Sequence, residues 1–194
     1  MSVSVRPEPT PNPATMKFQF SERLSEKTQE FASAQETDIS PLAQKLFGFP
    51  WTEKVFIGPD FVTVTKQDWV DWDVLQEPLA GLIAEHFEAG QPLWVDYTPS
   101  NDYDDGDTDI VKSIKDALAR DIRPVVAMDG GDIVFAKFED GILTLQMKGA
   151  CAGCPSSQAT LKEGIEVRMK ELNQDALNKG LAHAAELWGK LLKR

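Results

Sequence analysis

Residues 149–157, Gly149-Ala150-Cys151-Ala152-Gly153-Cys154-Pro155-Ser156-Ser157, contain both cysteines of this 194-residue chain. A run of strand-forming residues precedes the stretch, and a periodic apolar pattern typical of a helix follows it. Two sulfurs separated by two residues can close a small disulfide or hold one soft metal centre. We therefore expect the function of the chain to centre on Cys151 and Cys154.

The segments on either side place these cysteines in a loop. Residues 133–138 and 142–147 alternate as strands do, and a short acidic turn between them predicts a hairpin that leads into Gly149. Ser156 or Ser157 is a plausible N-cap for a helix. That helix carries apolar residues at helical spacing: Leu161, Ile165, Met169 and Leu172. Because backbone N–H groups and the dipole at a helix start favour negative charge, this position favours thiolate over thiol.

Two further patterns precede the hairpin. Thr108 can cap a helix over residues 110–118, which Arg123-Pro124 is expected to end. The sequence Asp129-Gly130-Gly131-Asp132 predicts a turn, since adjacent glycines allow left-handed backbone angles. We expect this turn to shape the cysteine site or simply to serve the fold.

The first half of the chain predicts a separate mixed domain with no catalytic spacing in it. Its expected elements are an extended lead-in at 7–13, a strand at 14–20, a helix from Ser40-Pro41 to Gly48, a hairpin at 55–57 and 61–65, a helix at 75–87 and a short strand at 93–95. Residues 21–40 show no clear pattern. We expect His86, Trp69 and Trp72 to serve packing.

Between the two halves, Asp96 to Asp109 holds six aspartates and few apolar residues, which indicates a solvated linker. A calcium loop is excluded. With Gly106 at its sixth position, Tyr103 and Lys112 would occupy positions that need carboxylates.

The composition narrows the function classes. A net charge of −11 disfavours nucleic-acid binding, because the phosphate backbone would be repelled. No apolar run approaches the roughly 20 residues that span a bilayer, and no membrane partner is expected. Two cysteines do not make a disulfide scaffold, and the first residues resemble neither a secretory signal nor a transit peptide. We therefore expect a cytoplasmic location, where the cysteines bind metal or carry out redox chemistry.

The number of ligands predicts how such a metal site is built. An iron–sulfur cubane or a zinc–thiolate site needs four sulfurs, and one chain supplies two. Neither His86 nor His183 belongs to a motif that would place it nearby. Two chains that face each other supply four sulfurs, which predicts a homodimer. A cluster held this way would lie at a protein interface near solvent and would be easy to give away.

The motifs also resemble a known family. Thr10-Pro11-Asn12-Pro13 with Met16-Lys17-Phe18, and further matches through residue 95, are similar to the N-terminal domain of Nfu-type iron–sulfur proteins. The string from Arg123-Pro124 through the paired glycines to Gly149–Ser157 and Gly164-Ile165-Glu166 resembles the C-terminal domain of NifU and the Nfu carriers.

This resemblance implies specific properties. Cys151 and Cys154 would bind a [4Fe–4S] cluster bridged between two subunits, and the cluster would be delivered to apo iron–sulfur client proteins after receipt from an upstream scaffold. The first domain would choose partners, and the chain would not be an enzyme. Two alternatives stay open from the residues alone. One is a thiol–disulfide oxidoreductase that uses the same cysteine pair, and the other is a structural zinc site or a pure adaptor.

We expect an α+β protein of two small mixed domains joined by an acidic linker. The predicted divisions are 9–95, the linker 96–107, the cluster-binding domain 108–173 and an extra helix at 174–194. That last segment departs from the family pattern, which commonly continues with a proline-containing, valine-rich stretch. Its apolar stripe, including Leu177, Leu181 and Trp188, predicts either a packed terminal helix or a docking helix.

Overall fold

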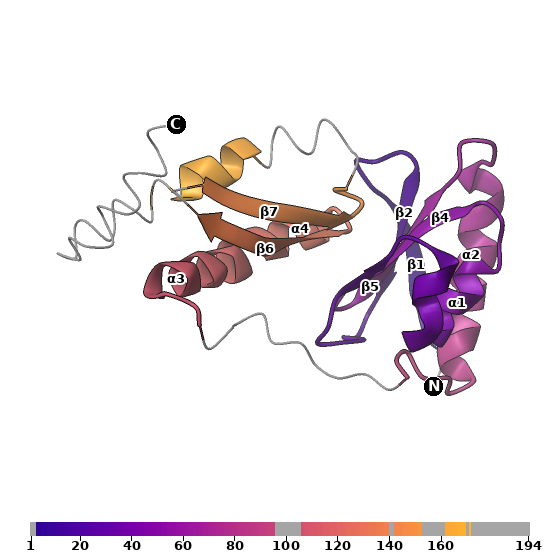
Figure 1. Ribbon diagram of the computed structural model, residues 1–194. Helices are drawn as coiled ribbons and strands as arrows, with labels where there is room; N and C mark the ends of the chain where they lie inside the picture. Colours follow the sequence, from indigo (N-terminus) through magenta and orange to yellow (C-terminus); the bar gives the residue numbers. More distant parts are fainter. Residues whose placement is uncertain (1–2, 96–105, 140–141, 153–161, 170, 172–194) are drawn as a thin grey trace. The chain divides into compact units, whose positions relative to one another are not determined.

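The computed structural model describes residues 3–95, 106–139, 142–152, 162–169 and 171. The chain forms two compact units, shown in Figure 1. The first unit consists of Met1–Pro99, Val126–Asp132 and Lys148–Cys154, and the second of Ser100–Val125, Ile133–Met147 and Pro155–Arg194. Helices and antiparallel sheets occur together, so the predicted α+β class is confirmed. Within the described residues, no helix has the length and apolar character needed to cross a bilayer.

The first unit is built on a five-stranded antiparallel sheet with the order β1-β2-β5-β4-β3. Its strands are β1 (Val5–Pro9), β2 (Thr15–Phe20), β3 (Gln29–Phe31), β4 (Thr52–Ile57) and β5 (Phe61–Lys66). The predicted strand at 14–20 and the hairpin at 55–65 are confirmed. The first part of the proline-rich lead-in forms strand β1, where only an extended segment was expected. β1 is an edge strand, a position in which prolines are tolerated.

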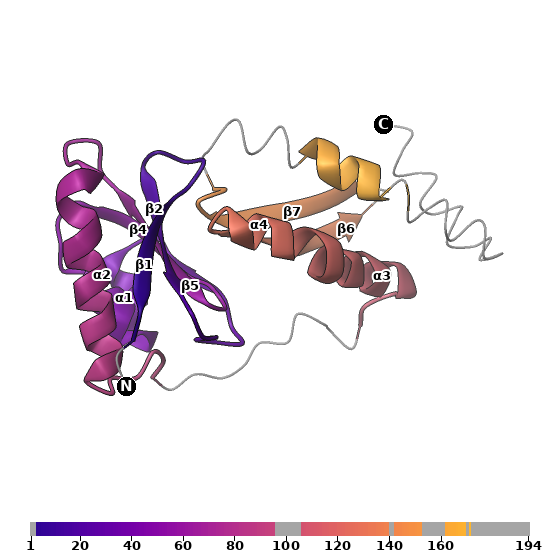
Figure 2. The same ribbon diagram turned by 180° about the vertical axis from the view of Figure 1, so that it is seen from behind.

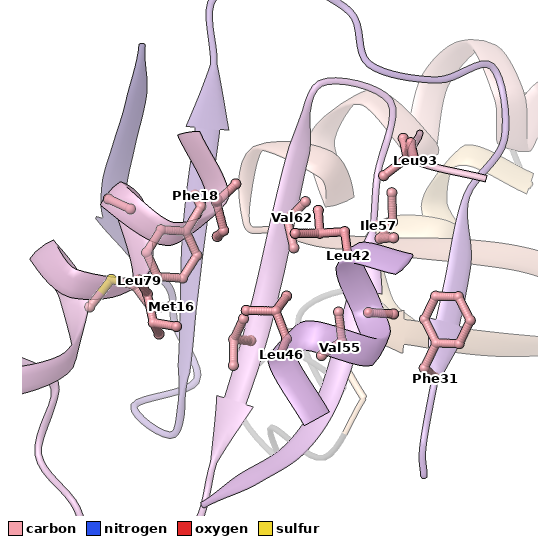
Figure 3. Close-up of a cluster of buried hydrophobic side chains, with 14 of the residues drawn as sticks. Met16, Phe18, Phe31, Leu42, Leu46, Val55, Ile57, Val62, Leu79 and Leu93 are labelled. Carbon is pink, nitrogen blue, oxygen red and sulfur yellow. The ribbon is translucent and has the colours of Figure 1, made fainter. Parts of the chain in front are cut away.

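Two helices cover one face of this sheet, as Figures 1 and 2 show from opposite sides. They are α1 (Pro41–Phe47) and α2 (Trp72–Glu88). The Ser40 hydroxyl accepts a hydrogen bond of 3.3 Å from the Ala43 amide, which is the predicted helix start. Alternate strand residues such as Phe18, Val55 and Val62 point at the helices and form the core drawn in Figure 3.

Some features of the first unit differ from the sequence-based expectations. Residues 21–40 contain β3 and a 3-10 helix, η1 (Ala34–Ile39), both too short to give a periodic pattern. The predicted strand at 93–95 is wrong, although Leu93 is buried in the core. Trp69 is 67% exposed and does not serve packing as predicted, whereas Trp72 packs against the core.

The remaining helices follow the linker. They are α3 (Asp109–Ala117), the π-helix η2 (Leu118–Ile122) and α4 (Arg123–Met128). The Thr108 hydroxyl caps α3 by accepting a hydrogen bond from the Val111 amide at 3.4 Å. The expectation that Arg123-Pro124 ends this helix is wrong. In the π-turn the Arg123 amide donates to the Leu118 carbonyl, and this wider turn accommodates Pro124 so that the chain continues as α4.

A two-stranded sheet completes the fold. It pairs β6 (Gly131–Glu139) with β7 (Ile142–Gly149), which confirms the predicted strands. Residues 162–169 are helical, as predicted, and bury Ile165 and Met169. Ser156, Ser157, Leu161, Leu172 and the segment 174–194 lie outside the described residues, as does most of the linker.

His86 is the one histidine that the structure describes, and it is fully buried in α2. Its Nε2 lies 3.2 Å from the Pro92 carbonyl oxygen. Since a carbonyl only accepts, Nε2 carries the proton and Nδ1 is left buried without a partner. Burial, with a smaller contribution from the charge of Lys45, lowers the pKa of His86, although its hydrogen bonding to Pro92 opposes the shift. The predicted packing role of His86 fits this placement.

This histidine predicts a pH-dependent stability for the first unit. In the folded state the neutral imidazole of His86 resists protonation. The unfolded state therefore binds more protons around the ordinary histidine pKa of about 6.5. The contribution of neutral His86 is therefore complete above about pH 6.5 and is lost as the pH falls towards the lower folded pKa. We expect His86→Gln to lack this part of the slope, which reaches at most about 1.4 kcal/mol per pH unit. Urea unfolding from pH 7.5 to 5 measures it, and equal slopes in both proteins would contradict the assignment.

Candidate functional site

Cys151 lies just beyond the end of β7, in a loop closed by backbone hydrogen bonds. Gly149 has a φ of 65°, a left-handed angle that turns the chain out of the strand. The Ala152 amide then donates to the Gly149 carbonyl at 3.1 Å, and the Ala150 amide donates to the Gly130 carbonyl at 3.1 Å. The loop and the paired-glycine turn are thus joined directly. Cys154 lies outside the described residues.

Gly131, the second of the paired glycines, lies against Cys151. A methyl group placed on Gly131 would lie 2.6 Å from Cys151 Sγ and 2.8 Å from the Lys148 carbonyl oxygen. Gly130 has a φ of 80°, so the predicted turn is confirmed at residues 129–130, whereas Gly131 and Asp132 already belong to β6. Sequence reasoning left open whether the turn shapes the site. In the structure, the lack of a side chain at Gly131 creates the space that the sulfur fills.

The loop is buried, contrary to the expectation of a site near solvent. Cys151 is 1% exposed and Ala150 is 2% exposed. Two side chains distant in sequence hydrogen-bond to the loop within the first unit: Asn12, in the turn between β1 and β2, and Glu30 on β3. The Gly149 amide donates to Glu30 Oε2 at 2.7 Å, and Asn12 Nδ2 donates to the Ala150 carbonyl at 3.4 Å.

Two more side chains hold the glycine turn and the residue before it. Thr28 Oγ1 donates to Asp132 Oδ2 at 2.8 Å, and Lys17 Nζ donates to the Met128 carbonyl at 3.2 Å. Sequence reasoning gave none of these roles. Thr28 and Glu30 fall in residues 21–40, which show no periodic pattern. Asn12 and Lys17 were named only as part of the family resemblance, with no contact predicted for them.

Charged side chains of both signs lie near the loop, two lysines together with the carboxylates of Glu30 and Asp132. Lys148 directly precedes Gly149, and Lys27 is close enough to feel its charge. Burial lowers the pKa of Lys27, and repulsion from Lys148 adds to the effect. The Lys27 ammonium also lies 5.0 Å from the centre of the Trp94 ring.

In the second unit, an ionic cluster fixes the helix that follows the cysteines. Asp121 on η2 accepts from Arg120 and from Arg168 Nε, in both cases at 2.9 Å. These hydrogen bonds, with that from Arg120 the larger cause, lower the pKa of Asp121 to about 2. Arg168 also pairs with Glu171 at 2.8 Å. The carboxylate therefore ties η2 to residues 162–169 at all ordinary pH values.

The described residues do not complete a metal site by themselves. Among them, no group of three or more His, Cys, Asp or Glu side chains is placed to hold a metal ion. His86 is enclosed in the core of the first unit and engaged by Pro92. A metal bound at Cys151 would need its remaining ligands from outside this set, such as Cys154 or a second chain.

Comparison with known proteins gives two family matches in one chain. Residues 5–90 match the family described as the scaffold protein Nfu/NifU N terminal, and residues 114–177 match the NifU-like domain. The human protein named NFU1 iron-sulfur cluster scaffold homolog, mitochondrial, is 40% identical over 165 residues, which cover 84% of this chain and 65% of that protein. NifU-like protein 5, mitochondrial, of Arabidopsis thaliana is 40% identical over 169 residues, which cover 84% and 62%.

This chain thus spans somewhat less than two thirds of the length of these two relatives. Both are named as mitochondrial proteins, a finding that contradicts the cytoplasmic location expected from the sequence. The solution structure of a NifU-like protein from Saccharomyces cerevisiae is 23% identical, with a TM-score of 0.44, and covers 49% of this chain and 87% of that one.

Proposed function

Because this chain belongs to the Nfu family of iron–sulfur cluster scaffold proteins, we propose that it holds an iron–sulfur cluster as cargo through Cys151 and Cys154. Members of this family are scaffolds, so the chain is not an enzyme. The observation that carries the proposal is the position of Cys151. Cys151 lies two residues after the end of β7 and inside the NifU-like match. The absence of a side chain at Gly131 leaves room for its sulfur.

We further propose that the cargo is a [4Fe–4S] cluster shared by two subunits. A cubane takes four thiolates, and two chains that each bring Cys151 and Cys154 supply four. Each thiol loses its proton when it binds iron, and nearby lysines such as Lys148 favour the resulting negative charge. A cluster held by two ligands per chain is more easily released than one enclosed by a single chain.

Transfer to apo iron–sulfur proteins is the proposed outcome, with an upstream scaffold as the source of the cluster. The fold disfavours the oxidoreductase alternative. The cysteine loop follows the antiparallel β6–β7 hairpin, whereas thioredoxin-like proteins place such a pair after a strand of a β-α-β unit.

Anaerobic loading with iron and sulfide tests this proposal. We expect sulfur-to-iron charge-transfer absorption, roughly two irons per chain and a doubling of mass on sedimentation. Incubation of the loaded protein with an apo [4Fe–4S] enzyme should then activate that enzyme. A loaded monomer that retains its cluster in the presence of the apo-enzyme would contradict both sharing and transfer.

A further inference from the structure

The five-stranded sheet has a second face, away from α1 and α2, that is also buried. Phe56, Phe61 and Thr63 belong to this face, because their neighbours Val55, Val62 and Val64 point into the core. Phe56, Phe61 and Thr63 are each 1% exposed. An antiparallel sheet with helices on one side commonly leaves its other face in water. The apolar residues on both faces of β4 and β5 therefore indicate that something covers the second face.

The cover is the backbone of the cysteine loop and the glycine turn. A methyl group on Gly149 would lie 2.9 Å from Phe56 Cδ1, and one on Gly130 would lie 2.9 Å from Thr63 Cγ2. Both glycines have positive φ angles and bring bare backbone against the sheet. The apolar part of the contact thus consists of glycine backbone against the Phe56 ring and the Thr63 methyl group, with no room for added side chains.

Four hydrogen bonds accompany this apolar contact: Asn12, Lys17 and Thr28 each donate one, and Glu30 accepts one. The shortest joins the Gly149 amide to the Glu30 carboxylate at 2.7 Å, and a charged acceptor makes it stronger than a neutral pair. Lys17 is held in place by its own contacts, 3.6 Å from Glu8 Oε2 and 5.2 Å from the centre of the Phe61 ring.

We propose that the second face of the sheet is a docking site for the cysteine loop of the same chain, and that docking withholds Cys151 from a second subunit. The docked Cys151 residue is 1% exposed, whereas a cluster shared between two chains needs each sulfur at an open surface. The loop must leave the sheet before a cluster can be shared. This inference rests on the proposed function only in naming the cluster as what the freed cysteine binds.

Docking and cluster sharing are then coupled and opposed. The apparent affinity for the cluster is proportional to the fraction of chains whose loop is undocked, so docking lowers it. By the same linkage, a bound cluster holds the loop and the glycine turn off the sheet and uncovers Phe56 and Thr63. Weakening the docking contacts should therefore speed loading without any change in the ligands.

Alkylation of the apo-protein measures docking directly. In a Cys154→Ser background, Cys151 is the only thiol, and its reaction rate with iodoacetamide reports the fraction of free loop. Glu30→Lys removes the charged acceptor of the Gly149 amide and adds a cation near Lys148. We expect it to raise the rate about tenfold or more, since a hydrogen bond to a charged group contributes that factor. Glu53→Lys, at an exposed position of β4, makes the same charge change and should leave the rate unchanged.

Thr28→Val provides a second variant of nearly the same shape, which removes the bond to Asp132 and should also raise the rate. Thermal unfolding identifies any variant that fails to fold. The inference is overturned if Cys151 of the Cys154→Ser protein reacts as fast as glutathione. It is also overturned if folded Glu30→Lys and Thr28→Val proteins react no faster than Glu53→Lys. Cluster loading of the same docking variants with Cys154 restored separates the two proposals. Faster alkylation with no loading in any protein rejects the cluster and keeps the docking, and normal loading with unchanged alkylation does the reverse.

Discussion

Cys151→Ala is expected to abolish cluster loading in the otherwise intact chain. The change removes one of two sulfurs per subunit and so leaves a dimer with two thiolates where a cubane requires four. Cys154→Ala should have the same effect, because the dimer uses both positions twice. After anaerobic reconstitution and desalting, we expect iron to fall from roughly two per chain to near zero and the charge-transfer absorption to disappear.

Ala152→Ser is the matched control for these variants. It changes a partly buried residue of the same loop but keeps both sulfurs, and it should load as the parent does. A Cys151→Ala protein that still binds a full complement of iron would place the ligands elsewhere in the chain. An equal loss of iron in Ala152→Ser would show that loop packing, and not the thiolate, was measured.

Gly149→Ala is expected to cost about 3 kcal/mol of unfolding free energy. The left-handed φ of 65° contributes about 1 kcal/mol of this, because a Cβ is unfavourable there. Crowding contributes the rest, since the new methyl would lie 2.6 Å from the Gly130 carbonyl oxygen and 3.0 Å from Gly131 Cα. Urea unfolding followed by circular dichroism measures the loss.

Gly90→Ala separates these two causes. Gly90 has nearly the same φ, 66°, but a methyl there would meet nothing within 4 Å. We expect it to lose only the backbone part, about 1 kcal/mol. If both substitutions cost the same amount, the close approach of backbone at Gly149 does not matter for stability.

The sequence predicted the elements whose patterns are local. The helix at Ser40-Pro41, the hairpin around Gly58 and the hairpin before Gly149 all carry a cap, a turn or an alternation within a few residues. Cys151 could be singled out because its residue type is rare in this chain. The paired glycines also predicted a turn, since their backbone freedom is visible in the sequence itself.

The surroundings of Cys151 could not be predicted in the same way. Glu30 lies 119 residues from Gly149 in sequence, and no periodic pattern connects them. The burial of Phe56 and Phe61 on the second face left one sign in the sequence: both the odd and the even positions of these strands are apolar. That pattern does not say which segment covers the face. The π-turn before Pro124 was missed because a proline commonly ends a helix, and only the three-dimensional path of η2 shows how it is accommodated.

The buried second face of the sheet has a practical consequence for work with fragments of this protein. A fragment cut after residue 95 would keep its folded strands and helices but lose Gly130 and Gly149, whose backbone lies against Thr63 and Phe56. The fragment would expose an apolar patch to water, and we expect it to self-associate and to bind hydrophobic dyes. The excised module would therefore report on self-association as much as on its own stability.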